Sequence, residues 1–442
     1  MSGSRPQLPG GPYLVVGLAR SGIAAALALH ARGERAVGVD AGAPDVTRLR
    51  AAGVEVHLDA AGIDLVSRAR TLVKSPGVPQ DAPVVRAARD AGLAVVGEVE
   101  LAWRLLSNDF IAVTGTNGKT TTTELLGHVH RTAGLPVTVA GNVGTAVTTL
   151  IGALDPAATI VCETSSYQLE DTLAFAPDAA ILLNVTPDHL DRHGTLEAYR
   201  EAKLEAFRRQ TAADVAVTST SLADVLPGEG RRVTFGAAAD GATVALHDDG
   251  TITWEGAPLM PAAEIGIPGP HNRENAMAAA AVALARGVDP GAVREGLRSF
   301  GGVAHRLEPV AERDGVAYVN DSKATNVDAT QVALRSYPAG TVHLIAGGVP
   351  KAQQFAPLAP LVAERCAAVY LIGEGAGEIG EALAGTGVPL HDVGDMERAV
   401  AAAGAAARPG EVVLLSPACA SFDQYPDFEA RGDHFRRLVG EH

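Results

Sequence analysis

The clearest chemical motif is a glycine-rich loop between an apolar run and an amphipathic stretch, FIAVTGTNGKTTTTELLGHVH, at residues 110–130. Glycines let backbone N–H groups converge on phosphate oxygens at a helix N-terminus, where the helix dipole favours an anion. Lys119 would add a point charge for the β and γ phosphates, and the Thr120 hydroxyl could bind Mg²⁺. The spacing GxxGKT is two residues shorter than the general Walker pattern, but strand, loop, lysine and hydroxyl follow in the expected order. We therefore predict a nucleotide-phosphate site rather than an ordinary glycine turn before a helix.

Further ligands for a metal ion follow two other apolar runs. Glu163 ends the run TIVCE, at the carboxyl edge of a strand, where α/β folds place their ligands. The segment ILLNVTPDHLDR, on what we expect to be a neighbouring strand, brings Asn184, Asp188 and His189 to the same edge. A solvated glutamate and a structural histidine are the plain alternatives. Because the preceding runs are apolar and should be buried, we predict that Glu163 and His189 bind a metal ion or substrate.

A lysine lies in the apolar stripe of a helix predicted at residues 195–209. The stripe consists of side chains three and four residues apart: Leu196, Tyr199, Lys203 and Phe207. Such a lysine either extends its ammonium to the edge of the stripe or serves as a partner for the metal site. From the helix alone, the first interpretation ranks higher.

Short β-rich runs alternate with helical stretches along the chain, which indicates an α/β fold with parallel sheets covered by helices. The first unit, YLVVGLARSGIAAALALHARG followed by AVGVD, is typical of half a dinucleotide-type fold. A second series begins at Phe110 and a third follows His305. An Asp-Gly pair at 249–250, between alternating runs, predicts a β-hairpin. We predict three domains, at residues 1–97, 98–304 and 305–442.

The composition narrows the classes of partner. A formal net charge of −15 without Lys or Arg clusters excludes an extended nucleic-acid surface. Cys162, Cys366 and Cys419 are widely spaced and lack CxxC spacing, so we expect reduced thiols and neither a disulfide framework nor a zinc site. The opening MSGSRPQLPGGP has no signal-peptide pattern, and no stretch approaches the ~18 apolar residues that span a bilayer. We expect a cytoplasmic monomer without membrane insertion.

These motifs resemble the Mur ligase family over nearly the whole chain. TGTNGKTTT and GPHNRENAMAA resemble motifs shared by the family, whereas SPGV, GEVEL, ETSSYQLE, NDSKATN and LLSPACASFDQYPDFEARG resemble its D-glutamate-adding member. The resemblance implies an N-terminal dinucleotide-like domain for the UDP substrate, a central P-loop ATPase domain with a mostly parallel sheet, and a C-terminal dinucleotide-like α/β domain for the incoming amino acid. It implies an ATP-dependent ligase that joins D-glutamate to UDP-N-acetylmuramoyl-L-alanine through an acyl phosphate, forming ADP and phosphate. Such an enzyme serves peptidoglycan precursor synthesis, and through it cell-wall biogenesis, cell shape, cell division and the cell cycle.

The resemblance also implies site residues wherever the motifs match. ATP would be bound by Gly115, Thr116, Asn117, Gly118, Lys119, Thr120, Thr121, Thr122, Asn275, Arg306 and Asp321. The UDP substrate would contact Leu18, Asp40, Ser75, Asn142, Ser165 and Gln168, and D-glutamate would contact Lys323, Thr325, Lys351, Ser421 and Phe428. Two Mg²⁺ ions are implied, with ligands from Thr120, Glu163, His189 and Lys203, the last as a carbamate. The catalytic set is Lys119, Glu163, His189 and Lys203. Since a carbamylated lysine is an anion, the resemblance reverses the ranking of the two interpretations of Lys203.

The likeness is weakest near the N-terminus. GLARSG lacks the middle glycine of GxGxxG, and Asp40 is followed by Ala41 and Gly42, which offer no hydroxyl or guanidinium to a uridine. Gly17, Gly22 and Asp40 are compatible with a nicotinamide-dependent oxidoreductase, although a GxxxxG turn is weak evidence. The phosphate loop alone also fits a nucleotide-dependent switch protein, but no guanine-specificity motif follows it. Ligases that add L-alanine or a diamino acid, and folylpolyglutamate synthase, are nearer alternatives; the SPACASFDQ motif and the lack of a DNPR-type stretch argue against them.

Overall fold

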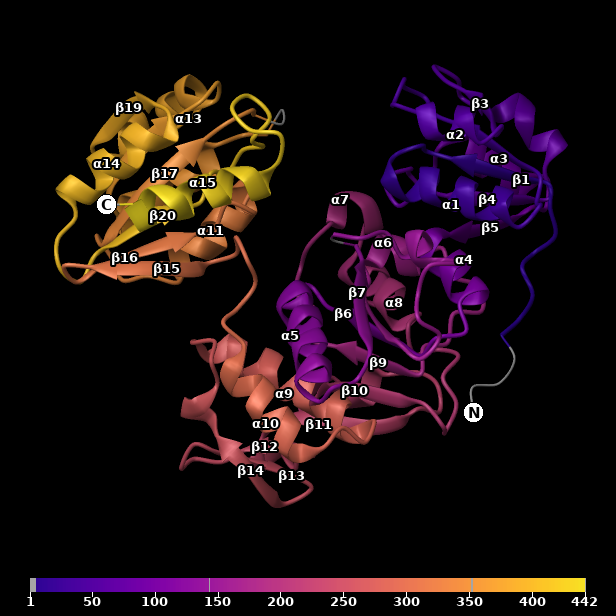
Figure 1. Cartoon of the computed structure of the whole chain (residues 1–442), viewed down its shortest axis with the longest axis horizontal. Helices are drawn as coiled ribbons and strands as arrows, with labels where there is room; N and C mark the ends of the chain where they lie inside the picture. Colours follow the sequence, from indigo (N-terminus) through magenta and orange to yellow (C-terminus); the bar gives the residue numbers. More distant parts are fainter. Residues whose placement is uncertain (1–4, 143, 351–352, 442) are drawn as a thin grey trace. The chain divides into compact units, whose positions relative to one another are not determined.

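The computed structural model describes residues 5–142, 144–350 and 353–441. The chain divides into two compact units, Met1–Phe300 and Gly301–His442. The first unit contains a five-stranded and a nine-stranded sheet, and the second contains one sheet of six strands (Figure 1). Most neighbouring strands are parallel, which confirms the predicted α/β class with three mostly parallel sheets. The predicted domain boundaries near 97 and 304 stay predictions.

The five-stranded sheet has the order β3-β2-β1-β4-β5, and all of its strand pairs are parallel. Alternate residues of β1 face opposite sides, so Val15 joins the core under α1 while Leu14 joins the core under α3. Helices therefore cover both faces, as the apolar runs predicted. The elements are β1 (Tyr13–Val16), α1 (Arg20–Ala31), β2 (Ala36–Val39), α2 (Thr47–Ala51), β3 (Glu55–His57), η1 (Ile63–Arg68), β4 (Thr71–Lys74), α3 (Pro83–Asp90), β5 (Ala94–Gly97) and α4 (Glu98–Leu105).

The nine-stranded sheet has the order β14-β13-β12-β11-β10-β9-β6-β8-β7. Its helices are α5 (Lys119–Thr132), α6 (Ser166–Leu169), α7 (Leu190–His193), α8 (Leu196–Leu204), α9 (Pro270–Ala285) and α10 (Pro290–Ser299). Its strands are β6 (Phe110–Thr114), β7 (Val137–Gly141), β8 (Thr159–Glu163), β9 (Ala179–Leu182), β10 (Val215–Ser219), β11 (Arg231–Ala237), β12 (Val244–Leu246), β13 (Thr251–Trp254) and β14 (Ala257–Pro261). Short 3₁₀ turns complete it: η2 (Val147–Leu150), η3 (Thr220–Val225), η4 (Ala238–Asp240) and η5 (Ala262–Glu264).

The predicted hairpin is confirmed at one end of this sheet. Strands β12 and β13 pair antiparallel, and Asp249 accepts a hydrogen bond from the Thr251 backbone N–H at 2.8 Å. Gly250 has a φ of 83°, which a residue without a Cβ adopts readily. Two other predictions need correction. Strand β9 is not next to β8, because β6 lies between them, and helix α8 ends at Leu204 instead of continuing to residue 209.

A buried ion pair connects the two sheets of the first unit. Lys74, the last residue of β4, lies 2.8 Å from Asp171, and the two side chains are 0% and 1% exposed. The backbone N–H of Gly97, at the end of β5, donates to the Asp171 carbonyl at 2.8 Å. The carboxylate of Glu98 accepts hydrogen bonds from the backbone N–H and the hydroxyl of Thr148. These contacts join the edge of the five-stranded sheet to the loops of the nine-stranded one.

The sheet of the second unit has the order β15-β16-β20-β17-β18-β19, and only its β15–β16 pair is antiparallel. One face packs against α11, α12 and α13, and the other against α14 and α15. Its strands are β15 (Glu308–Arg313), β16 (Val316–Asn320), β17 (Val342–Gly347), β18 (Cys366–Ile372), β19 (Leu390–Gly394) and β20 (Val412–Leu415). Its helices are α11 (Val327–Arg335), η6 (Ala356–Leu358), α12 (Ala359–Arg365), α13 (Ala376–Leu383), η7 (Ala384–Thr386), α14 (Met396–Ala406) and α15 (Phe428–Glu441). Across the described ranges of both units, no helix combines the length and apolar character needed to cross a membrane.

Candidate active site

The phosphate loop leads directly from strand β6 into helix α5. Gly115 and Gly118 have φ angles of 152° and 84°, which side chains other than hydrogen rarely allow. A Cβ on Gly118 would also lie 2.2 Å from the amide oxygen of Asn275 in α9, so α9 lies directly against the loop at this glycine. The Lys119 ammonium donates to the carbonyls of Gly115 at 3.0 Å and Thr116 at 2.8 Å. The loop is therefore formed with its cation already folded over it.

Asn184, at the end of β9, holds the phosphate loop in place. Its amide oxygen accepts from the Asn117 backbone N–H at 2.9 Å, and its amide nitrogen donates to the Asn117 carbonyl at 3.2 Å. The Thr116 hydroxyl donates to the Thr186 carbonyl at 3.2 Å and accepts from the Thr186 N–H at 3.0 Å. The sequence placed Asn184 at this edge of the sheet; its contacts give it the role of positioning the loop.

Glu163 and Asn142, which the sequence assigned to a metal ion and to the UDP substrate, contact each other. Glu163 is 3% exposed at the end of β8, and its carboxylate accepts from the Asn142 side-chain amide at 3.0 Å. His189 immediately precedes α7 with a φ of 52°, and its imidazole lies 3.5 Å from the Asp188 carboxylate. Both of these side chains are partly exposed, at 45% and 40%.

The predicted ligands are few, and this number suits Mg²⁺ bound together with a nucleotide. Within the ranges that the structure describes, no group of three His, Cys, Asp or Glu side chains converges as a metal site. The predicted donors are instead one carboxylate, one imidazole and the Thr120 hydroxyl, supplemented by an anionic Lys203. Mg²⁺ suits such a sparse set because it retains several waters and takes phosphate oxygens from a nucleotide.

The amine of Lys203 is buried beneath the phosphate loop. It is 1% exposed, donates to the Gly115 carbonyl at 2.8 Å and lies 4.2 Å from the centre of the Tyr199 ring. Burial, and then the positive charge of Lys119, lower the pKa of Lys203 to about 6, against the opposing effect of Asp188. The interpretation that this lysine extends to solvent is wrong. At neutral pH the amine is largely unprotonated and hence nucleophilic.

Three residues predicted to contact the UDP substrate meet at the carboxyl edge of the five-stranded sheet. The Leu18 backbone N–H donates to the Asp40 carboxylate at 2.6 Å, and the Ser75 hydroxyl donates to the Gly17 carbonyl at 2.6 Å. The second Asp40 oxygen accepts from the Gly42 N–H at 2.8 Å. Asp40 therefore fixes the backbone of the GLARSG turn, which lacks the middle glycine of GxGxxG, through the Leu18 N–H.

The other two predicted UDP-substrate residues, Ser165 and Gln168, form a capping box at the start of α6. The Ser165 hydroxyl accepts from the Gln168 backbone N–H at 3.3 Å, and the Gln168 side chain accepts from the Ser165 N–H at 3.0 Å. This reciprocal bonding fixes the direction in which the segment leaves β8.

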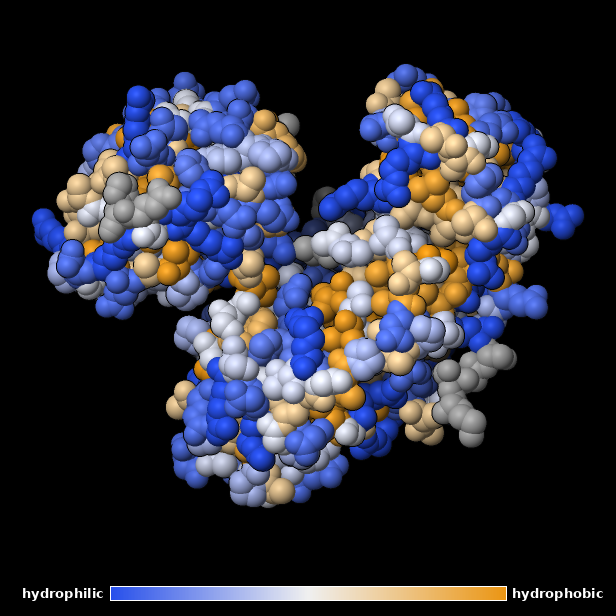
Figure 2. Space-filling model, viewed as in Figure 1, coloured by the Kyte–Doolittle hydropathy of each residue, from blue (hydrophilic) through white to orange (hydrophobic). Residues whose placement is uncertain are grey.

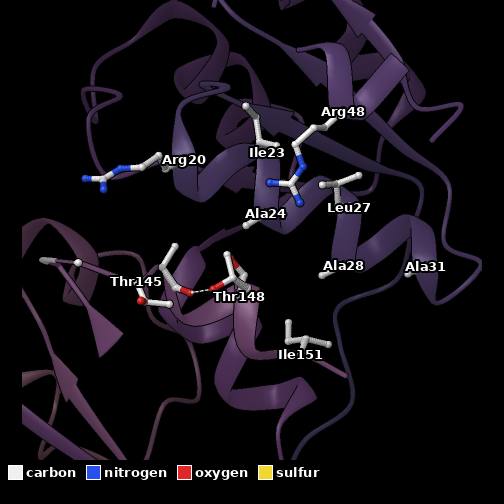
Figure 3. Close-up of a pocket in the computed structure, with 13 residues that line it drawn as sticks. Arg20, Ile23, Ala24, Leu27, Ala28, Ala31, Arg48, Thr145, Thr148 and Ile151 are labelled. Atoms are coloured by element: carbon white, nitrogen blue, oxygen red, sulfur yellow. Dashed lines mark hydrogen bonds between the residues drawn. The ribbon is translucent and has the colours of Figure 1, made fainter. Parts of the chain in front are cut away.

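A cavity of about 490 Å³ in the first unit lies between α1 and residues 144–151. Arg48 points over it between Ile23 and Leu27, whereas Arg20 points away at one end (Figure 3). Hydrophobic residues are exposed on this part of the first unit, amid a mostly hydrophilic surface (Figure 2). Since no predicted UDP-substrate residue lines the cavity, it lies beside the predicted substrate site and does not coincide with it.

In the second unit, Asp321 lies at the carboxyl end of β16. Its carboxylate accepts from the Ser416 hydroxyl at 2.8 Å and the Leu307 backbone N–H at 3.1 Å. Burial raises the pKa of Asp321 to about 7, against the opposing effects of these hydrogen bonds and of Arg306. Arg306 itself is exposed. The predicted ATP residues are thus divided, with the phosphate loop and Asn275 in the first unit and this pair in the second.

The predicted D-glutamate residues of the second unit lie on neighbouring loops. The Lys323 ammonium is 5.8 Å from the centre of the Phe428 ring, and the Ser322 hydroxyl donates to the Phe428 carbonyl at 2.8 Å. Ser421 is buried within the segment that connects β20 to α15. Lys351 lies outside the described residues.

One buried side chain in this region was missed by the sequence analysis. Arg431 is 1% exposed and contacts three of these loops. A signal was present, because Phe428, Arg431, Phe435 and Leu438 recur at helical spacing, which is the pattern that singled out Lys203.

Three family models match the chain in order. The N-terminal domain of MurD-like Mur ligases matches residues 12–97, the Mur ligase middle domain matches 113–283, and the glutamate ligase domain of Mur ligases matches 305–419. The chain is 42% identical to the UDP-N-acetylmuramoylalanine–D-glutamate ligase of Acidobacterium capsulatum, over 99% of this chain and 97% of the relative. It is 44% identical to the ligase of the same name from Frankia casuarinae, over 97% and 93% of the two chains.

Solved structures show the same fold at lower identity. The UDP-N-acetylmuramate–alanine ligase of Thermotoga maritima gives a TM-score of 0.59 at 20% identity, over 98% of this chain and 100% of that one. The MurF ligase of Thermotoga maritima in complex with ADP gives 0.56 at 18% identity, over 99% and 98%. The resemblance inferred from the motifs is confirmed. With three domain models in sequence and relatives above 40% identity over nearly its full length, the chain belongs to the Mur ligase family.

Proposed function

We propose that the chain is a cytoplasmic ATP-dependent ligase that adds D-glutamate to UDP-N-acetylmuramoyl-L-alanine, forming ADP and phosphate in peptidoglycan precursor synthesis. The observation that carries this proposal is the identity of 42% to a UDP-N-acetylmuramoylalanine–D-glutamate ligase over 99% of the chain. The geometry of the phosphate loop supports it, since Lys119 and the amine of Lys203 both donate to the Gly115 carbonyl.

The reaction requires activation because a carboxylate is a poor acyl donor. A carboxylate oxygen of the substrate attacks the γ phosphorus of ATP, the bond to the bridging β–γ oxygen breaks, and ADP leaves. The amine of D-glutamate then attacks the acyl carbon, phosphate is expelled, and the nitrogen loses a proton as the amide forms. Lys119 and the loop N–H groups would stabilise the charge on the transferring phosphoryl group.

Thr120, Glu163, His189 and a carbamylated Lys203 would hold the magnesium ions of this site. Bound magnesium would neutralise the charge of the nucleotide phosphates. Asn142 would orient Glu163 for this role through the 3.0 Å hydrogen bond between them.

The state of the Lys203 amine supports the proposed carbamylation. A neutral, buried amine can add to CO₂, forming an N–C bond and releasing one proton, and the resulting anion would be stabilised by the nearby positive charge of Lys119. The chain has only five lysines, Lys74, Lys119, Lys203, Lys323 and Lys351. Carbon-13 NMR of the protein in labelled bicarbonate should therefore give one carbamate resonance that is lost in Lys203→Ala. Persistence of that resonance in the variant would refute the assignment to Lys203.

Activity provides the second test of Lys203. The Lys203→Ala variant should lose ligation, and small carboxylates should restore part of it by replacing the missing anion. Glu201→Ala, on the exposed side of the same helix, is the matched control and should remain active. Full turnover by Lys203→Ala would remove this residue from the site.

The proposed reaction is tested by measuring ADP or phosphate release with ATP, Mg²⁺ and UDP-N-acetylmuramoyl-L-alanine while the acceptor amino acid is varied. Turnover should depend on D-glutamate and should stop when the UDP substrate is omitted. L-Glutamate, L-alanine and a diamino acid serve as comparison acceptors. Turnover without dependence on D-glutamate would rule the proposal out.

A further inference from the structure

Arg431 is a buried cation that binds only neutral oxygens. Its Nε donates to the Ser322 hydroxyl at 2.9 Å, and Nη2 donates to the carbonyls of Ser322 at 2.9 Å and Cys419 at 3.1 Å. Its Nη1 donates to the carbonyls of Ala420 at 3.2 Å and Gly347 at 3.5 Å. Every nitrogen of the guanidinium is therefore engaged, and none of these partners carries a charge.

No carboxylate forms an ion pair with Arg431 among the residues that the structure describes. Arg436, on the same helix, provides the contrast, because it pairs with Glu308 at 2.6 Å and Asp433 at 2.7 Å. A buried charge without an opposite charge is costly, since low-dielectric surroundings replace water. Hydrogen bonds to carbonyls and a hydroxyl satisfy the donors of Arg431. Burial lowers the pKa of Arg431, and the nearby Asp423 carboxylate, which forms no ion pair with it, opposes this effect only in part.

The carbonyls bound by Arg431 belong to the loops that carry the predicted D-glutamate residues. Ser322 precedes Lys323 in the loop after β16, and Ala420 precedes Ser421 in the loop after β20. Gly347 ends β17 and begins the segment that leads to Lys351. The Ser322 hydroxyl also donates to the Phe428 carbonyl, which ties the start of helix α15 to the same point.

We propose that Arg431 is a positioning residue for the acceptor amino acid, holding the backbone at Ser322, Gly347 and Ala420 in register and making the potential at their surface more positive. This inference rests on the proposed function, because it concerns the acceptor of that reaction. A positive potential favours binding of an acceptor with two carboxylates, such as D-glutamate, over an amino acid with an uncharged side chain. The charge acts from beneath the loops, so the guanidinium need not touch the acceptor.

The test compares Arg431→Met and Arg431→Lys with Arg437→Met, a control that removes the same charge from an exposed position of the same helix. For Arg431→Met, the KM for D-glutamate should rise by about tenfold, equivalent to about 1.4 kcal/mol. The kcat at saturating D-glutamate and the KM for ATP should stay within about twofold of the wild-type values, because weaker binding of D-glutamate alone leaves the chemical step unchanged. A purely structural role would instead reduce the active fraction, and with it kcat, at constant KM.

Arg431→Lys keeps the charge but loses the fork of donors, so its KM for D-glutamate should lie between those of the wild type and Arg431→Met. If Arg431→Met does not fold, Arg431→Lys decides alone: a KM equal to that of the wild type overturns the positioning role of the guanidinium donors. A KM for Arg431→Lys as high as that of a folded Arg431→Met would overturn the electrostatic part. Absence of D-glutamate-dependent turnover in the wild type would instead refute the proposed function.

Discussion

Replacing Lys203 by Met should stabilise the first unit of the chain without ligands while abolishing ligation. Methionine has a similar length and no ionisable group, so it can occupy the buried position between Tyr199 and the phosphate loop. The wild-type amine is 1% exposed, and no ion pair involves it in the described part of the chain. Removing it should therefore relieve an unfavourable burial.

The magnitude follows from the pKa of Lys203, which folding lowers from 10.5 to about 6. Between these two values the unfolded chain binds a proton that the folded chain does not bind. The free energy of unfolding of the wild type therefore rises with pH across this window, by about 1.4 kcal/mol per pH unit. At pH 8 the loss of the proton on folding costs the wild type about 3 kcal/mol of stability. The variant avoids this cost but loses the hydrogen bond to the Gly115 carbonyl, which is worth about 1 kcal/mol. We expect Lys203→Met to be more stable than the wild type by about 2 kcal/mol at pH 8, with the difference shrinking as pH rises.

Tryptophan fluorescence during urea unfolding measures this effect selectively. The only two tryptophans, Trp103 and Trp254, both lie in the first unit. Samples should be free of Mg²⁺ and CO₂, so that the amine stays unmodified, and compared at pH 7, 8, 9 and 10. Glu201→Gln, on the exposed side of α8, is the control whose pH dependence should match that of the wild type. If the free energies of Lys203→Met and the wild type run parallel with pH, the amine is not buried in the way described.

Two further substitutions test other buried charges. Lys74→Met should destabilise the first unit by about 3–5 kcal/mol, because it leaves Asp171 buried without its partner. Adding Asp171→Leu to the same chain should recover most of that loss. An equal loss of stability in the double variant would contradict the role given to this ion pair. Asp321→Asn should stabilise the second unit increasingly as pH rises from 4 to 7, because folding raises the pKa of this carboxyl from 3.8 to about 7 and the folded chain keeps a proton that the unfolded chain releases. The gain should level off near 4 kcal/mol above pH 7 (about 3 pKa units), measured by hydrogen exchange in peptides of residues 301–441, and a gain independent of pH would contradict it.

Local features of the fold could be predicted because they depend on contiguous residues. The run Phe110–Thr114 is apolar up to its last residue and is followed by Gly115. The strand and the loop after it can therefore be predicted from the local order of residues. The hairpin at Asp249 and Gly250 could be predicted because an Asp-Gly pair between alternating runs is a strong local turn signal, although residues 247–250 connect the two strands in the structure. The family motifs also allowed site residues to be predicted that lie far apart in the sequence, because such motifs carry information about contacts between distant segments.

Pairing between distant segments could not be predicted in the same way. Nothing in the residues of β8 and β9 states that β6 lies between them, because order within a parallel sheet is set by crossover connections and by packing of the covering helices. The hydrogen bond between Asn142 and Glu163 has the same origin, since it joins the ends of adjacent strands that are 21 residues apart. Helix α8 ends at Leu204, although its apolar spacing continues to Phe207.

The buried cations separate into two kinds by what surrounds them. Lys74 has Asp171 at 2.8 Å, so the chain itself supplies the opposite charge and the pair serves the structure. Lys203 and Arg431 lie in apolar helical stripes, and neither forms an ion pair within the described ranges. Helical spacing can identify such residues, but whether the side chain is covered depends on loops from elsewhere in the chain. An unpaired buried ionisable group opposes folding, whether it keeps its charge, as at Arg431, or loses its proton, as at Lys203. In the proposals made above, the partner of each group comes from outside the chain: CO₂ for Lys203, and a dicarboxylate acceptor for Arg431.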